Sequence, residues 1–453
     1  MDGLPASSNS RVAAVLPLHL DAVVSSLAPG GDGVAHVELE GERRAVFIPY
    51  TAPGDRARVE VDPSRRPARG RLVALGSAGP DRVPAACAWS TRCGGCDWMH
   101  LSLEAQSRTH VEHVRAALPP AWRSLPIVPS ATAPVGGLGY RTRARVHVRS
   151  LPRGRVLVGM REARSHEPVE VDACAVLDPA LETARRSLAA LFAGARGRGD
   201  VQLALGVGRR PVLEIRWDGE LSPAVFGRLE RAVADRSLAG ARVHAGEAMR
   251  PAPVGDPTPW MSAADGYPLR LAPGGFGQAC EPMNTRLALY VASVVRSWQT
   301  DHAVELYAGA GNLSVLLARE ARDLACVESS RDAVVAARAN LAARGIENTR
   351  VVEADAEAYT WNKSTTLVVL DPPRTGARAV AERLAASRVA HVVYVSCDAQ
   401  TLGRDLALLE PAYEPASDLA HGQPSIATFE MFPQTSHVEV VVALTRRGER
   451  RRP

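Results

Sequence analysis

The stretch from Ala303 to Asn312, AVELYAGAGN, decides the fold class of this chain. A strand-like apolar run leads into a turn with two glycines, and a helical pattern follows. Gly309 and Gly311 let the backbone approach a ligand closely, and the start of the next helix favours polar or anionic groups. Ser314 stands where the third glycine of a G-x-G-x-x-G turn would be, which disfavours NAD as the ligand.

Strand-like runs and helical segments alternate from about residue 282 onward. The runs are AVELYAG, LACVES, TRVVEAD, TLVVLDPP, HVVYVSC and HVEVVVALT. This alternation predicts an α/β fold with a doubly wound, mostly parallel, Rossmann-like sheet. One helix is predicted from Ser330 to Arg344, with the serine as its N-cap and Gly345 at its end.

Acidic residues end the second and third strands of this region. Glu328 lies seventeen residues after Gly311, where it can accept hydrogen bonds from ribose hydroxyls, and Asp355 is placed to meet a base amino group. Ligands of such sheets bind outside the carboxyl ends of the strands, so the pattern predicts a nucleotide-type site. The alternative is that Glu328 and Asp355 only cap the helices that follow them.

A cysteine and a carboxylate are predicted near the same edge. Cys397 ends the strand-like run HVVYVSC, the loop DPPRTG (371–376) ends the run before it, and Glu439 begins the last run. With a methyl donor, these groups suit methylation of carbon 5 of uracil. A thiolate adds to carbon 6, carbon 5 then takes the methyl group, and a base removes the carbon 5 proton. The alternative for Cys397 is an inert, small buried side chain.

The N-terminal half has a different pattern. Short β-prone runs broken by PGGDG and APGD predict a small β-barrel over residues 22–75, after a loose leader at 1–15. A helix is predicted over Leu103–Leu118, stopped by Pro119-Pro120. Strands and helices in irregular order predict a central α+β region over residues 140–267, with a helix at Ala180–Phe192.

The composition is that of a globular protein with a slight basic excess. The 453 residues are 46% hydrophobic and 23% charged, and the net charge of +5 is compatible with binding nucleic acid. Arginines at strand spacing in YRTRARVHVR (140–149) are candidates for RNA contacts, the alternative being a solvated face. We find neither an export signal nor an apolar run of membrane-spanning length, and expect a cytoplasmic monomer without a membrane partner.

Three of the seven cysteines, Cys87, Cys93 and Cys96, lie within ten residues. In a chain without an export signal, such a cluster favours metal binding over disulfides. We expect Cys280 and Cys326 to be inert buried residues.

Three motifs of the C-terminal half resemble the RNA uracil-5 methyltransferases that act on tRNA and ribosomal RNA. They are DPPRTG (371–376), VSCDAQTLGRD (395–405) and EMFPQTSHVE (430–439), and the resemblance extends from about residue 16 to 445. It implies S-adenosylmethionine as methyl donor, Cys397 as nucleophile and Glu439 as the base. It also implies a cofactor site formed by Gln278, Tyr307, Gly309, Gly311, Asn312, Glu328, Asp355 and Asp371.

The resemblance further implies four parts. They are a TRAM-like, RNA-binding β-barrel (16–76), a central α+β domain with an iron-sulfur site (77–275), a methyltransferase domain (276–445) and a basic tail (446–453). Cys87, Cys93 and Cys96 match the family's C-x5-C-x2-C spacing, and Cys174 stands where a fourth ligand to a [4Fe-4S] cluster is expected, with zinc as the alternative.

A barrel combined with a cluster favours 23S rRNA as the substrate. The alternatives are tRNA and an inactive RNA-binding or rRNA-assembly factor. The chain departs from the family at Ala399, where proline is usual, at Ala279-Cys280, where valine and asparagine are usual, and at Glu430, where aspartate is common. None of these departures removes a reacting group.

Overall fold

The computed structural model describes residues 17–39, 41–130, 135–165, 167–246, 250–417 and 419–448. The chain divides into two compact units, Met1–Pro84 with His100–Ser102, and Ala85–Met99 with Leu103–Pro453. The expected leader and residues 449–453 of the expected tail lie outside the described residues. Within the described ranges, no helix combines the length and the apolar character needed to cross a membrane.

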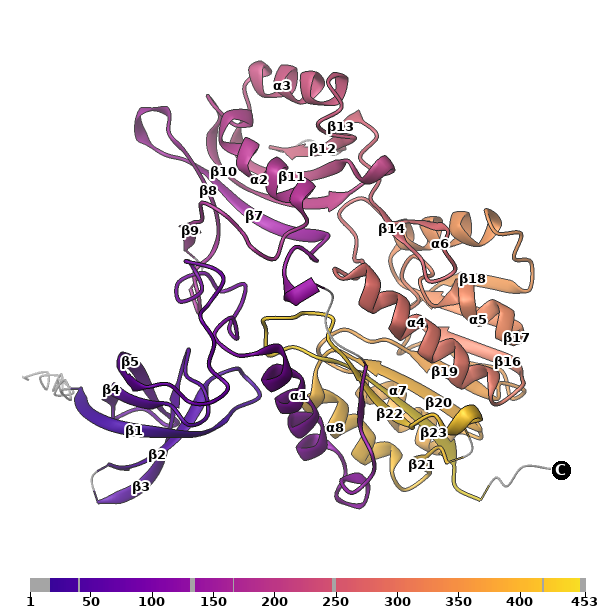
Figure 1. The fold of residues 1–453 in the computed structure, drawn as a ribbon. Coiled ribbons are helices and arrows are strands. Elements are labelled where there is room, and N and C mark those ends of the chain that lie inside the picture. The colour runs from indigo at the N-terminus through magenta and orange to yellow at the C-terminus, as the bar shows by residue number, and fades with distance from the viewer. Residues whose placement is uncertain are drawn as a thin grey trace, which may run out of the picture. The chain divides into compact units, whose positions relative to one another are not determined.

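Five strands close into a β-barrel in the first unit (Figure 1), as expected for residues 22–75. Apolar residues alternate with polar ones and fill the interior, as in β4, where Ala57, Val59 and Val61 are buried. The strands pair in the order β1-β2-β3-β5-β4. Their bounds are β1 Leu18–Leu27, β2 Gly33–Leu39, β3 Glu42–Ile48, β4 Arg56–Asp62 and β5 Ala68–Ser77.

A seven-stranded sheet is built from residues 143–255 of the second unit. Two helices, α2 (Pro179–Leu191) and α3 (Pro223–Ala234), join its apolar core, and α2 confirms the helix expected at Ala180–Phe192. The strand order is β13-β12-β11-β10-β7-β8-β9. The bounds are β7 Arg143–Ser150, β8 Val156–Arg161, β9 Pro168–Glu170, β10 Arg196–Leu205, β11 Pro211–Glu220, β12 Gly240–Ala245 and β13 Ala252–Gly255.

The arginines expected on one strand face are not all exposed. Arg145 and Arg149 are exposed on β7, but Arg143 is buried and its guanidinium donates a hydrogen bond to the Gly275 carbonyl. The expectation of an RNA contact is therefore wrong for Arg143, because its charge is directed at the protein's own backbone.

The C-terminal half forms the doubly wound sheet expected from its α/β pattern. Strands β18, β17, β16, β19 and β20 are parallel neighbours, and β23 runs antiparallel beside β20. The bounds are β16 Thr300–Leu306, β17 Ala321–Glu328, β18 Thr349–Glu353, β19 Leu367–Leu370, β20 His391–Ser396, β21 Tyr413–Pro415, β22 Ile426–Phe429 and β23 Glu439–Arg446. A separate pair, β14 (Trp260–Ser262) and β15 (Pro268–Arg270), precedes this sheet in the chain.

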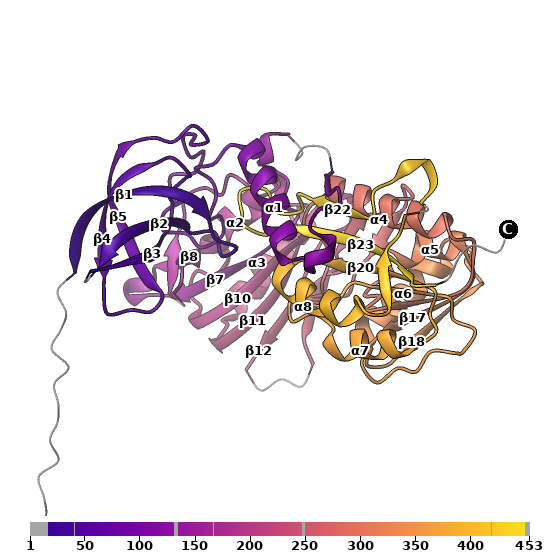
Figure 2. The ribbon, with the colours of Figure 1, turned by 90° about the horizontal axis from the view of Figure 1, so that it is seen from below.

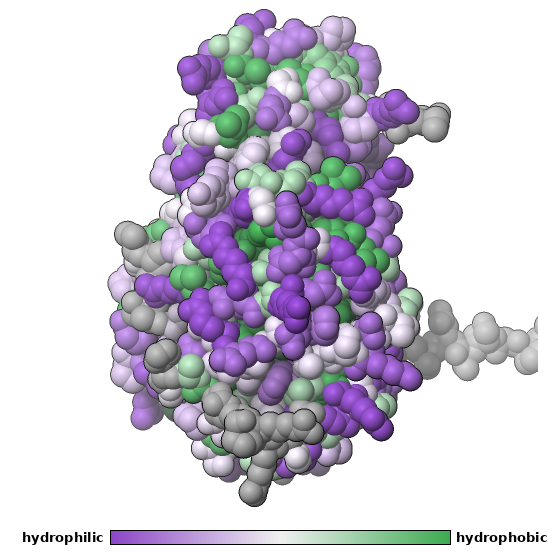
Figure 3. Space-filling view, turned by 90° about the vertical axis from the view of Figure 1, so that its right-hand side faces the viewer, coloured by the Kyte–Doolittle hydropathy of each residue, from purple (hydrophilic) through white to green (hydrophobic). Residues whose placement is uncertain are grey.

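Helices cover both faces of this sheet. Two separate apolar cores result, one with α4, α5 and α6 and the other with α1, α7 and α8. The bounds are α4 Glu281–Arg296, α5 Ser314–Glu320, α6 Arg331–Ala342, α7 Arg378–Ala386 and α8 Ala399–Leu409. Figure 3 shows one side of the molecule as mainly hydrophilic with scattered apolar patches, as amphipathic outer helices produce.

Two elements from the N-terminal half of the chain pack on the C-terminal sheet. Helix α1 (Leu103–Ala117), close to the expected Leu103–Leu118, lies beside α8 in Figures 1 and 2. Strand β6 (Val128–Pro129) pairs with β22 and forms the sheet's edge. This placement brings α1 close to the chain that leads into β23.

The start of α6 differs from expectation. Ser330 precedes the helix, but its side chain makes no capping hydrogen bond; instead its backbone N–H donates to Glu328. Gly345, at φ +64°, follows the helix as expected.

Candidate active site

Antiparallel pairing of β20 and β23 brings Cys397 beside Glu439. Ser396, the last residue of β20, pairs with Val440 of β23. Cys397 follows Ser396 directly, and Glu439, the first residue of β23, precedes Val440, so the two residues are neighbours of one cross-strand pair. The carboxylate of Glu439 is close enough to the thiol of Cys397 to act on its pKa.

The groups around Cys397 favour its neutral thiol. Burial and the carboxylates of Glu439 and Asp371 raise the pKa of Cys397 to about 12, and Arg374 acts in the opposite direction. Burial also raises the pKa of Asp371 to about 6. Burial and Asp371 hold the pKa of Glu439 well above its ordinary value, again opposed by Arg374. Arg374 is thus the cation that stabilises negative charge at both Cys397 and Glu439.

Three of the residues expected at the site carry buried polar atoms that lack a hydrogen-bond partner in the described part of the chain. These atoms are Gln278 Oε1, the Tyr307 hydroxyl oxygen and Glu439 Oε2. Buried polar atoms nearly always have partners, so these three atoms are available to bind a ligand. The three residues come from different parts of the chain, namely the segment before α4, the turn after β16 and the start of β23.

The turn after β16 is held by the end of β17. Tyr307, Gly309 and Gly311 all have positive φ, at +62°, +56° and +87°. Glu328 Oε2 accepts a hydrogen bond of 2.9 Å from the Gly309 N–H. A Cβ placed on Gly309 would meet no atom within 4 Å, so the turn faces open space there. The backbone is therefore both fixed and accessible, as close approach of a ligand requires.

Asn312 anchors this turn to helix α4. Its amide exchanges two hydrogen bonds, of 3.0 and 2.8 Å, with the amide of the fully buried Asn284 on α4. The pair ties the turn to the first part of α4.

Glu328 and Asp355 both accept backbone hydrogen bonds from the residues that follow them. Glu328 Oε1 accepts from the Ser330 N–H at 2.6 Å, and Asp355 Oδ1 accepts from the Glu357 N–H at 2.8 Å. The Glu328 contact lies just before α6, as the capping alternative requires, but Glu328 also reaches the glycine turn. Asp355 is exposed and is followed by a turn, so it caps no helix.

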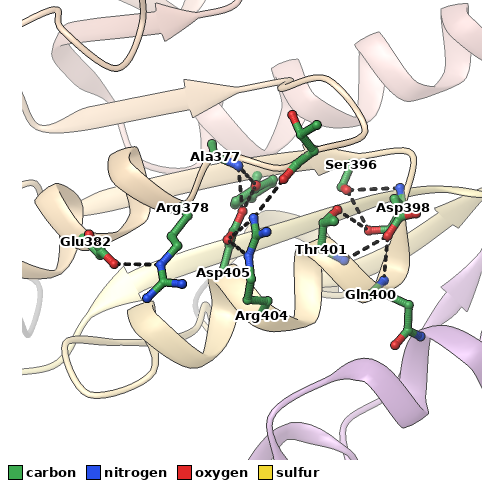
Figure 4. A network of polar contacts seen from close by, with 11 residues as sticks. Ala377, Arg378, Glu382, Ser396, Asp398, Gln400, Thr401, Arg404 and Asp405 are labelled. Atoms are coloured by element: carbon green, nitrogen blue, oxygen red, sulfur yellow. Dashed lines mark hydrogen bonds and ion pairs between the residues drawn. The ribbon is translucent and has the colours of Figure 1, made fainter. Parts of the chain in front are cut away.

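A polar network holds the turn that carries Cys397 (Figure 4). Asp398 caps α8 by accepting hydrogen bonds from the N–H groups of Gln400 and Thr401, at 3.0 and 2.9 Å. Ser396 Oγ accepts from the Asp398 N–H at 3.2 Å and donates to its carbonyl at 3.0 Å. Cys397 therefore lies between two residues that are bonded to each other.

Asp405 joins three elements around this turn and was not anticipated from the sequence. Its fully buried carboxylate accepts hydrogen bonds of 2.7 Å from both the Ala377 N–H and the Tyr394 hydroxyl, and it pairs with Arg404 at 2.7 Å. The 371–376 loop, β20 and α8 are thereby fastened together (Figure 4). Asp405 lies on the same helix face as Leu402, Leu406 and Leu409, and an acidic residue on an apolar face is the sequence pattern that could have predicted its buried role.

The four cysteines expected to bind metal line one cavity of about 610 Å³. Arg141 and Arg374 also line it. Among the described residues, no three His, Cys, Asp or Glu side chains are grouped closely enough to hold a metal ion. Cys280 and Cys326 are fully buried, as expected for inert residues.

Known proteins resemble this chain over nearly its whole length. A family profile described as tRNA (Uracil-5-)-methyltransferase matches residues 265–367 and 360–447. The 23S rRNA (uracil(1939)-C(5))-methyltransferase RlmD of Alkalilimnicola ehrlichii is 30% identical, and the alignment covers 94% of this chain and 96% of that protein. The protein of the same name from Methylococcus capsulatus is 32% identical, with 93% and 96% covered. The chain belongs to the RNA uracil-5 methyltransferase family.

The fold of this methyltransferase agrees with a solved structure. The tRNA (uracil-54, C5)-methyltransferase of Pyrococcus abyssi, in complex with S-adenosyl-L-homocysteine, matches with a TM-score of 0.71 at 21% identity. The match covers 94% of this chain and all of that one.

The charges around the thiol predict how fast Cys397 is alkylated. At pH 8 Asp371 is ionised, so Asp371→Asn should lower the pKa of Cys397 and speed its alkylation about three- to tenfold. Arg374→Gln should slow it by a similar factor. Iodoacetamide labelling of the Cys397 peptide, followed by mass spectrometry, measures both rates. Arg378→Gln is the control, since it removes an exposed positive charge paired with Glu382; identical rates in all variants would contradict this electrostatic account.

The buried carboxylate of Asp405 predicts a large loss of stability in this methyltransferase. Asp405→Ala should lower the free energy of unfolding by about 3 kcal/mol, because it leaves the buried Tyr394 hydroxyl without its acceptor and the Ala377 N–H with only the Tyr394 hydroxyl oxygen. Arg404→Ala should cost less than about 1 kcal/mol, since the guanidinium is partly exposed. Urea unfolding monitored by circular dichroism compares the two variants, and equal losses would argue against a central role for Asp405.

Proposed function

We propose that this chain transfers a methyl group from S-adenosylmethionine to carbon 5 of a uridine in 23S rRNA, through a covalent adduct on Cys397. Relatives named as 23S rRNA uracil-5 methyltransferases, which align over nearly the whole chain, support the reaction and the substrate. The observation that carries the mechanism is the closeness of Cys397 and Glu439, which follow and begin the paired strands β20 and β23 and interact electrostatically.

The reaction starts when the thiol proton of Cys397 passes to water, and Arg374 favours the resulting thiolate electrostatically. The thiolate forms a bond to carbon 6 of the uracil, and the electrons of the 5,6 double bond move toward carbon 5 and the ring carbonyl. S-adenosylmethionine supplies the methyl group that carbon 5 takes up. Glu439 then removes the proton of carbon 5, the double bond re-forms, and the bond between Cys397 and carbon 6 breaks. The raised pKa of Glu439 suits a carboxylate that must take a proton from carbon.

The methyl donor would bind at the carboxyl ends of β16, β17 and β18. Gln278, Tyr307, Gly309, Gly311, Asn312, Glu328, Asp355 and Asp371 are the residues that we assign to this site. The accessible glycine turn and the unpaired Gln278 Oε1 and Tyr307 hydroxyl oxygen support the assignment.

An uracil must leave its base stack to reach Cys397, so a single-stranded or loop segment is the expected target. We assign residues 16–76 as a TRAM-like RNA-binding domain, 77–275 as a central domain and 276–445 as the catalytic domain. An RNA substrate of this kind accords with a cytoplasmic enzyme.

The base assignment predicts a trapped intermediate. Glu439→Gln should accumulate a covalent complex with methylated RNA, since elimination is blocked after methyl transfer, whereas Cys397→Ala should form none. Denaturing gels with 23S rRNA fragments and with tRNA transcripts, both carrying radiolabel, detect the complex and identify the substrate. A complex formed with tRNA alone would identify tRNA, and not 23S rRNA, as the substrate. Wild-type protein that methylates neither RNA would favour the alternative of an inactive RNA-binding factor.

We propose further that Cys87, Cys93, Cys96 and Cys174 hold a [4Fe-4S] cluster. The four thiols line one cavity. Four thiolates suit either zinc or such a cluster, and the uneven spacing with a distant fourth cysteine, which resembles cluster-binding relatives, favours the cluster. Burial raises the pKa of Cys93, Cys96 and Cys174, and the charge of Arg141 acts in the opposite direction, toward the thiolates that a cluster requires.

The metal content distinguishes the cluster from zinc. Protein purified without oxygen should contain iron and sulfide with broad visible absorption, and Cys96→Ser should lose most of both. Elemental analysis together with a sulfide assay provides the measurement. Protein that contains zinc alone would contradict the cluster.

A further inference from the structure

We infer that Gln106 on α1 is a positioning residue for the base Glu439, acting through the loop that leads into β23. The inference rests on the proposed function, since it takes Glu439 as the base. The loop in question, residues 430–438, connects β22 to β23 and is called the base loop here.

Gln106 binds the base loop with both ends of its amide. Its side chain is buried, with 1% of its surface exposed. Its Oε1 accepts a hydrogen bond of 2.8 Å from the Gln434 N–H, and its Nε2 donates to Gln434 Oε1 at 3.1 Å. The same Nε2 lies 3.2 Å from the carbonyl oxygen of Trp98. A single buried amide thus joins α1, the base loop and the segment that follows Cys96.

His110, one turn further along α1, holds the same loop. Its ring nitrogens lie 2.9 Å from Glu430 Oε2 and 3.2 Å from the Thr435 carbonyl oxygen. Positions four residues apart share a helix face, so Gln106 and His110 face the loop together. The loop is therefore bound at its beginning, through Glu430, and near its end, through Gln434 and Thr435.

The segment after Cys96 completes the attachment. The Trp98 N–H donates to the Gln434 carbonyl at 3.0 Å, and Asp97 Oδ1 accepts from the Ser436 N–H at 2.9 Å. The Trp98 ring stacks on His110 with 4.8 Å between the ring centroids. Gln106 lies at the centre of these contacts, because it is bonded to both Trp98 and Gln434.

The base loop matters because Glu439 follows it directly. Glu439 Oε2 has no hydrogen-bond partner among the described residues, so this oxygen has no polar contact there that would orient it. The backbone of Glu439 is paired with Phe429 on one side and follows the base loop on the other, so the base loop contributes to the position of the carboxylate. The glycine turn and Glu328 belong to other strand ends, so loosening the base loop should leave methyl-donor binding unchanged.

The proposed mechanism predicts which step is slowed when the base loop is loosened. A displaced base slows removal of the carbon 5 proton but not the earlier formation of the bond between Cys397 and carbon 6. A small misplacement of a reacting group can cost up to about 100-fold in rate. Gln106→Leu should therefore slow turnover about 10- to 100-fold and accumulate the covalent complex with methylated RNA.

The experiment compares Gln106→Leu with Glu439→Gln, Asp97→Ala and Asp97→Asn, using the full chain and its RNA substrate. Single-turnover methyl transfer, the amount of covalent complex on a denaturing gel and the affinity for S-adenosylmethionine are measured for each. Asp97→Ala should accumulate complex as Gln106→Leu does, and Asp97→Asn should behave like wild type because it keeps the acceptor oxygen. Glu112→Ala, on the exposed side of α1, is the matched control.

The outcomes separate the inference from the function on which it rests. Accumulated complex with unchanged donor affinity in both Gln106→Leu and Asp97→Ala supports the inference. Wild-type turnover in both variants, or a parallel loss of methyl transfer and covalent complex in them, overturns the inference about Gln106. If Glu439→Gln still forms the complex in that case, the proposed function stands. Absence of the complex in Glu439→Gln would overturn the proposed base itself.

Discussion

The antiparallel pairing of β23 with β20 is the constraint on which the site depends. The other central strands, β16 to β20, are parallel, so their carboxyl ends meet at one edge of the sheet. β23 runs in the opposite direction, and its amino end therefore reaches that same edge. This reversal is what puts Glu439, the first residue of a strand, beside Cys397, the residue after a strand.

Two buried acidic side chains, Asp371 and Glu439, lie at this edge of the sheet. Burial, Glu439 and Asp371 raise the pKa of Cys397, and Arg374 opposes them from the loop after β19. Burial weakens solvation and lengthens the reach of each charge, so one arginine influences both the thiol and the carboxylate. An arrangement of this kind keeps the thiol protonated in the free protein and makes its reactivity sensitive to any positive charge that enters the site.

Buried polar side chains hold the loops that carry these groups. Asp405 fastens the 371–376 loop to β20 and α8, and Gln106 with His110 fastens the base loop to α1. Apolar packing supplies most of the driving force for folding but specifies no direction, whereas a hydrogen bond does. The apolar cores on both sides of the sheet thus stabilise the domain, and these few amides and carboxylates orient its edge.

The sequence by itself determined the local features, because they depend on residues close together in the chain. The glycine turn at 307–311, the strand ends at Glu328 and Cys397 and the limits of α1 and α2 all follow from spacing and apolar periodicity. The tertiary structure alone decided which strands pair, that α1 and β6 pack on the C-terminal sheet, and that Gln106 and His110 are buried. Periodicity assigns a polar residue on a helix to the solvent, and it cannot reveal a partner more than 300 positions away, as between Gln106 and Gln434. Such partners exist only once the fold has brought distant segments into contact.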